Sequence, residues 1–231
     1  MRRLPAILSA VAMLAMVGTA SGALTLASVT SEWSDPVLQT GAVAPTTGSS
    51  DGQERIYWGW TMFPASQSYL GFTGADTPAD IPLDQPFALG TLWHGNTPIG
   101  QNTGITGVNL DLTLDFGAGA VPMSVPMDIY ETVGQGGGGP DTITLPTSFD
   151  PIAFQVGETE YELCLLGFAD SADGPMVSSL VTPECGVTST TLWAKVSATG
   201  GGTPVIPAPG ALLLSAIGAS TVGWLRRRRA I

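Results

Sequence analysis

Basic side chains are almost missing from the middle of this chain. Of its eight lysines and arginines, two arginines open the sequence and four close it, so only Arg55 and Lys195 lie between. All nineteen acidic residues lie in that middle region, from Glu32 to Glu184, and with two basic residues it carries a net charge of −17. A surface this acidic repels a phosphate backbone, which excludes nucleic acid as a partner.

Charged residues of both signs are also scarce, at 12% of the chain. A helical bundle or coiled coil needs many more glutamates, lysines and arginines, so both are excluded. Thirty glycines and eighteen prolines indicate frequent turns, while six tryptophans and seven phenylalanines supply anchors for a core. With 231 residues, the composition predicts one turn-rich β domain between two short tails.

The usual signatures of catalysis and cofactor binding are absent. The chain has one histidine, His94, and the common zinc spacings do not occur, so zinc catalysis is excluded. It also has no phosphate-cradling loop of the Gly-x-x-x-x-Gly-Lys-Ser/Thr type. A glycosidase that uses two carboxylates stays open, because its acids can lie far apart in the sequence. No cofactor is expected.

Residues 1–22 have the pattern of a secretory signal peptide. Arg2 and Arg3 precede an apolar run from Leu4 to Val17, and small residues then lead to a cleavage site after Gly22. The alternative is an uncleaved anchor, but the run is shorter than the ~20 residues that a membrane-spanning helix needs. The sequence therefore predicts export through the Sec translocon and cleavage by signal peptidase.

Residues 207–231 have the pattern of a sorting signal. A Gly/Pro linker over 200–206 leads to Pro207-Ala208-Pro209, then to an apolar stretch from Gly210 to Leu225 of membrane-spanning character. This tail resembles the PEP-CTERM signal of bacterial surface proteins, although Ala208 stands where that family has Glu. The resemblance implies cleavage near the motif by an exosortase-type transpeptidase; a plain, uncut anchor is the alternative. Four arginines follow and keep the C-terminus cytoplasmic by the positive-inside rule: Arg226, Arg227, Arg228 and Arg229.

Between the tails, apolar and polar residues alternate as they do in β-strands. The clearest case is 108–116, and a second strand at 121–129 places Pro122 and Pro126 on its outward face, which suits an edge strand. No sustained helical period occurs there. Residues 23–199 are therefore predicted to form an all-β antiparallel sandwich, with a jelly roll as one version. Further strands are predicted at 54–60, 68–73, 87–93, 142–145, 160–168, 176–181 and 190–198.

The segment from Phe87 to Ile99 resembles the strand-and-turn signature of the choice-of-anchor K domain, also called the THxN family of PEP-CTERM proteins. Trp93 stands where that family has Thr, and a glycine run replaces its Cys-bearing loop. The resemblance covers residues 30–199, implies an exported bacterial domain, and marks His94 and Asn96 as the family turn. A hydrogen bond of His94 within its own turn is the simpler alternative to ligand binding. Later matching pieces are 108–116, 130–132, 140–144, 161–168 and Glu184.

Calcium is the ion that the acidic loops would suit, because it binds carboxylate and carbonyl oxygens. Asp170 with Asp173 in one glycine-ended loop, or Glu131 with Asp141 across a glycine run, could supply ligands. Neither pair fits the EF-hand pattern, and solvated loop acids are the simpler explanation.

Tryptophans suggest carbohydrate binding as a further hypothesis. Trp58 and Trp60 are two residues apart, and in one strand they would share a face. Packing in the core is the simpler explanation for such large side chains.

Two cysteines, Cys164 and Cys185, permit one intramolecular disulfide in an exported protein. A strand, the turn at 170–174 and a return strand from Met176 would bring them face to face across a hairpin. We predict this bond, with two free thiols as the alternative.

The sequence as a whole predicts a non-enzymatic, exported surface or extracellular-matrix protein of a bacterium. It would start as a membrane-anchored precursor, and extracellular polysaccharide is the expected partner. The alternative is a carbohydrate-binding or carboxylate-pair glycan-active module. An enzyme of that kind would show a deep cleft with two carboxyl groups about 5–10 Å apart.

Overall fold

The computed structural model describes residues 24–60, 67–117, 119–132 and 139–200, and every regular element within them is a β-strand. The predicted signal peptide and sorting signal lie outside these residues. The strands are β1 (Leu24–Leu26), β2 (Ser28–Leu38), β3 (Thr46–Ser50), β4 (Gln53–Trp58), β5 (Ser68–Gly74), β6 (Ala79–Ile81), β7 (Pro86–Gly95), β8 (Ile105–Asp115), β9 (Ala120–Tyr130), β10 (Asp141–Thr144), β11 (Ile152–Val156), β12 (Thr159–Ala169), β13 (Ser179–Thr182) and β14 (Val187–Gly200).

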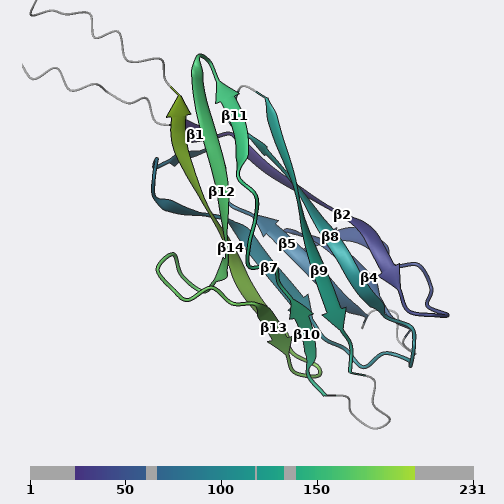
Figure 1. The fold of residues 1–231 in the computed structure, drawn as a ribbon. Helices are drawn as coiled ribbons and strands as arrows, with labels where there is room; N and C mark the ends of the chain where they lie inside the picture. Colours follow the sequence, from purple (N-terminus) through teal and green to yellow (C-terminus); the bar gives the residue numbers. More distant parts are fainter. Residues whose placement is uncertain (1–23, 61–66, 118, 133–138, 201–231) are drawn as a thin grey trace, which may run out of the picture.

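Two antiparallel sheets form a curled, sandwich-like arrangement (Figure 1). The five-stranded sheet has the order β13-β10-β9-β8-β2, and the seven-stranded sheet has the order β11-β12-β14-β7-β5-β4-β3. A small third sheet pairs β1 with β6. The all-β antiparallel prediction is therefore confirmed.

The alternation of apolar and polar residues that predicted β8 matches the burial of its side chains. Val108, Leu110, Leu112 and Leu114 are at most 2% exposed, whereas the polar residues between them are half-buried. On the facing sheet, Leu192, Ala194 and Val196 of β14 are likewise fully buried. The two apolar faces form one core, and burial of such side chains is the main force that holds the sheets together.

The prediction of an edge strand at 121–129 is wrong for one end of β9 and right for the other. The strand lies between β8 and β10, but β10 pairs only with Asp128, Ile129 and Tyr130. Pro122 and Pro126 lie before that segment, where β8 is the sole neighbour. Proline is tolerated there because the ladder does not need its missing N–H.

Within the part of the chain that the structure describes, no helix is long and apolar enough to cross a membrane.

Candidate functional site

A buried network of polar side chains connects the two sheets at one end of the sandwich. The seven-stranded sheet contributes Trp58 at the end of β4 and His94 in β7, and the other sheet contributes Thr182 of β13. Glu131, directly after β9, completes the crossing. We call this group, together with Asp141, the polar clasp.

His94 and Trp58 form the half of the clasp that belongs to the seven-stranded sheet. Their rings stack with centroids 6.0 Å apart and planes inclined by 10°. His94 Nδ1 shares a hydrogen bond of 2.7 Å with Thr182 Oγ1, and Trp58 Nε1 donates to Glu131 Oε1. Each ring therefore lies beside the other and holds one group of the opposite sheet.

His94 does not hydrogen-bond its own turn, contrary to the simpler expectation. It lies in β7, is 0% exposed, and reaches a residue 88 positions away. Asn96 is also buried, and its Nδ2 donates to the carbonyl oxygen of Thr182 at 3.0 Å. Thr182 Oγ1 makes a further hydrogen bond with Thr188 Oγ1 of β14. His94 and Asn96 therefore hold β13 against the seven-stranded sheet.

Glu131 and Asp141 form the acidic half of the clasp. They are 8% and 1% exposed, and their carboxyl groups are within hydrogen-bonding reach of each other. Asp141 Oδ1 accepts from the Thr132 amide at 2.8 Å and from Thr132 Oγ1 at 3.1 Å. Thr132 Oγ1 in turn lies 2.5 Å from the carbonyl oxygen of Gly139, so one threonine fastens both ends of the connection between β9 and β10.

Burial changes the acidity of each ionisable group in this region. Burial, and then repulsion from Asp141, raise the pKa of Glu131 to about 8. Burial also raises the pKa of Asp141, and burial together with repulsion from Asp141 raises that of Glu184, in the turn before β14. Burial lowers the pKa of His94 to about 4, so the imidazole is neutral at pH 7.

The predicted calcium pairs differ in where the structure places them. Glu131 and Asp141 are brought together, whereas Asp170 and Asp173 are both exposed in the loop after β12. Among the described residues, no group of three or more His, Cys, Asp or Glu side chains is arranged to hold a metal ion. Calcium binding at either pair stays a prediction.

Trp58 and Trp60 do not share a face. Trp58 is 1% exposed in the core, whereas Trp60 is 62% exposed beyond the end of β4. Gly59 between them has φ +89°, a left-handed conformation that turns the chain out of the strand. Core packing is thus confirmed for Trp58, and the paired sugar platform is wrong.

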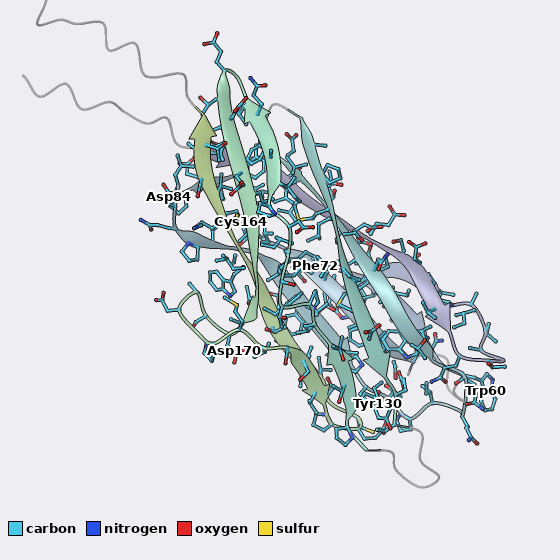
Figure 2. The ribbon with its side chains drawn as sticks, viewed as in Figure 1. Trp60, Phe72, Asp84, Tyr130, Cys164 and Asp170 are labelled. Carbon is cyan, nitrogen blue, oxygen red and sulfur yellow. The ribbon has the colours of Figure 1, made fainter. Side chains whose placement is uncertain are left out.

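The predicted Cys164–Cys185 disulfide is contradicted. Both thiols are free, and the return strand β13 joins the other sheet instead of forming a hairpin with β12. Cys164 lies opposite Lys195, eight residues along β14 from Val187, so about 26 Å separates it from the turn that holds Cys185. A disulfide needs Cα atoms within about 7 Å. Figure 2 shows Cys164 in the long strand β12, distant from the lower end of the molecule.

Two shallow grooves lie along the seam between β2 and the β3–β5 region. One has a volume of about 280 Å³ and is lined by Thr30, Ser31 and Glu54 among others. The adjoining one, of about 260 Å³, shares Ser31 and Glu54 and adds Glu32 and Arg55. None of the site residues predicted from the sequence lines either groove.

Sequence reasoning missed Trp58 and Thr182 as members of the clasp, and Thr132 as the residue that donates to Asp141. Thr132 had a local signal, since it follows Glu131 in a matched piece of the resemblance. Thr182 had none, because its partners His94 and Asn96 are more than 80 residues away.

The described residues define an all-β protein of the sandwich class. No model of a known protein family matches the chain, and no curated protein matches its sequence. The resemblance to choice-of-anchor K domains therefore stays a prediction based on its own residues. Three of these residues, His94, Glu131 and Asp141, belong to the polar clasp, and Asn96 donates to the carbonyl oxygen of Thr182 in it.

Proposed function

We propose that this protein is a non-enzymatic, exported surface or extracellular-matrix protein, sorted by its C-terminal PEP-CTERM-like signal. The tripartite tail carries the proposal: a short proline motif at 207–209, an apolar stretch to Leu225, and the arginine cluster at 226–229. The signal-peptide pattern at 1–22 gives the same direction of export. A jelly-roll-like sandwich, anchored first in the membrane by the tail, belongs to this proposal.

Support for a non-enzymatic role comes from the polar clasp. Its acids are buried and hydrogen-bonded, and Glu131 and Asp141 are in contact with each other. Glycosidases place their two carboxyl groups about 5–10 Å apart, with room for substrate or water between them. Groups this closely paired suit a structural connection between sheets better than acid–base catalysis.

The test is the fate of the tail in a bacterium that encodes an exosortase-type transpeptidase. The full chain, with an epitope tag after Ile231, is expressed in that host and in a matched strain without the transpeptidase. We expect the extracellular protein to begin at Ala23 and to lack the tag, and the tag to persist in the matched strain. A variant with Pro207→Ala and Pro209→Ala serves as the motif control and should retain the tag. An extracellular protein with Arg226 to Arg229 intact would contradict sorting by cleavage.

Carbohydrate binding is the second candidate, and the seam grooves are the observation that favours it. They combine hydroxyl groups, two glutamates and Arg55, which is fixed by Asp51 and Gln53 at 2.8 Å each. Fixed polar groups in a concave surface suit sugar hydroxyls. Pull-down on the producer's own exopolysaccharide, compared with a Glu32→Gln variant, tests this reading. If neither the wild-type protein nor the variant binds the exopolysaccharide, this would count against carbohydrate binding.

A further inference from the structure

The contact between Glu131 and Asp141 is independent of how the protein is exported or anchored. Two carboxylates in contact repel each other, and the two acids cannot both be charged without a large cost when they are buried. Asp141 Oδ2 is buried without a hydrogen-bond donor among the described residues. One proton on the pair provides a donor and removes the repulsion together.

Among the described residues, no basic side chain neutralises the pair. Glu184, from the turn before β14, adds a further repulsion. His94 of β7 stacks on Trp58, the donor to Glu131, and burial keeps its imidazole neutral. Arg55 is paired with Asp51 at 2.8 Å, and Lys195 lies opposite Cys164 on β14. These are the two basic residues of the described part of the chain.

The contacts of the pair show which parts of the molecule depend on it. Glu131 accepts from Trp58 of the opposite sheet, and Asp141 fastens Thr132 at the end of β9. Separation of the two carboxyl groups would therefore loosen the connection between β9 and β10 and its attachment to the seven-stranded sheet.

We propose that Glu131 and Asp141 form a proton-held latch, which closes this end of the sandwich while the pair shares one proton and opens it when both carboxyl groups ionise. On opening, the shared proton passes to solvent.

The direction of the pH effect follows from where Glu131 holds its proton. The pKa of Glu131 has its ordinary value of 4.5 in the unfolded chain and is raised to about 8 in the folded chain. A raised pKa of this kind stabilises the fold at low pH, and the gain is lost as pH rises through the window. Burial of His94 has the opposite effect below pH 6.5: its pKa is lowered to about 4 in the folded protein, so this residue makes the fold less stable as pH falls. The decline should therefore be clearest between pH 6.5 and 8, where the closed-to-open ratio falls roughly tenfold per pH unit.

Thermal unfolding of the full-length protein in neutral detergent, measured from pH 5 to 9, tests the latch. We expect the wild-type melting temperature to fall between pH 6.5 and 8. Glu131→Gln, a neutral isostere, should remove this fall, while Glu158→Gln, in the exposed turn before β12, should keep it. The same decline in Glu131→Gln as in the wild type would overturn the proposal.

Two further measurements decide the outcome even if Glu131→Gln does not fold. Carboxyl ¹³C NMR of the wild-type protein should show Glu131 titrating near pH 8; a midpoint near its ordinary value would overturn the latch. Millimolar calcium at pH 8 should leave the melting temperature unchanged. Recovery of the pH 6 melting temperature by calcium would mean that the pair holds a metal ion in place of a proton, and would overturn the proposal equally.

Discussion

The two ends of the sandwich are closed by different chemistry. At one end, the polar clasp joins the sheets through Trp58, His94 and their partners. At the other, Phe116 from the end of β8 stacks on Phe154 of β11 at 4.6 Å, and Phe154 stacks on Tyr161 of β12 at 5.4 Å. Strand β14 runs between them, with Thr188 opposite His94 and Ala198 opposite Tyr161, a span of about 33 Å. Figure 1 shows β11 and β12 at the upper end and β10 and β13 at the lower.

The difference between these ends lies in what each contact requires. Aromatic stacking depends on shape and apolar area, and its strength does not change with pH. The polar clasp depends on protonation, because buried polar groups stabilise only while each has its partner. The aromatic end should therefore behave alike at all pH values, and the polar end should not.

The largest expected effect is at Trp58, which serves the core and the clasp together. Trp58→Ala removes a fully buried indole, the stacking on His94 and the donor to Glu131. The free energy of unfolding should fall by about 3–5 kcal/mol, as for other buried aromatic residues. Urea denaturation at pH 6 measures it. A loss of under 1 kcal/mol would show that this end of the sandwich is not a closed core.

Replacement of His94 should change the acid side of the stability profile. Between pH 4.5 and 6.5, lowering the pH favours unfolding through His94 and opposes it through Glu131, so stability in the wild type should change less steeply with pH than in a variant without the histidine. In His94→Gln the histidine contribution, roughly 3 kcal/mol across the window, is gone. Stability should then fall steadily as pH rises from 4.5. Urea denaturation at half-unit pH steps measures this, and a level profile in the variant would contradict it.

Truncation at the aromatic end should cost less and show no pH signature. Phe154 is half-buried, so Phe154→Ala should lower the free energy of unfolding by about 2 kcal/mol, below the range for fully buried phenylalanine. The loss should be equal at pH 6 and pH 8. A loss that doubles between these pH values would remove the distinction between the ends.

The smallest effect is expected at the exposed loop acids. Asp170→Asn with Asp173→Asn changes two solvated side chains, and the melting temperature in calcium or chelator should match that of the wild type, with a stability change within about 0.5 kcal/mol. A calcium-dependent rise in the wild type that this variant loses would place a calcium site in the loop.

Sequence patterns predicted the long strands of the core better than the contacts at either end of the sandwich. Period-two alternation is a local signal, so β8 and β12 could be predicted from the chain alone. The register of β13 could not, because the choice between pairing with β12 and pairing with β10 depends on contacts far along the sequence. That choice separated Cys164 from Cys185 and brought Thr182 to His94.

Candidate residues were predicted more reliably than the roles assigned to them. Glu131 and Asp141 were selected as acids across a glycine run, and the structure does bring them together. Their burial follows from packing of two sheets, which no local pattern contains. The resemblance also selected His94 and Asn96, without indicating that they reach across to β13.

Amide hydrogen exchange at the two ends of the wild-type protein tests the account most directly. At the polar end the probe is the Thr132 amide, which donates to Asp141; at the aromatic end it is the amides of the β11–β12 hairpin. From pH 6.5 to 8, the exchange rate of the Thr132 amide should rise about tenfold per pH unit beyond the rise that base catalysis causes. The exchange rates of the hairpin amides should rise by base catalysis alone. Equal acceleration at both ends would contradict the account.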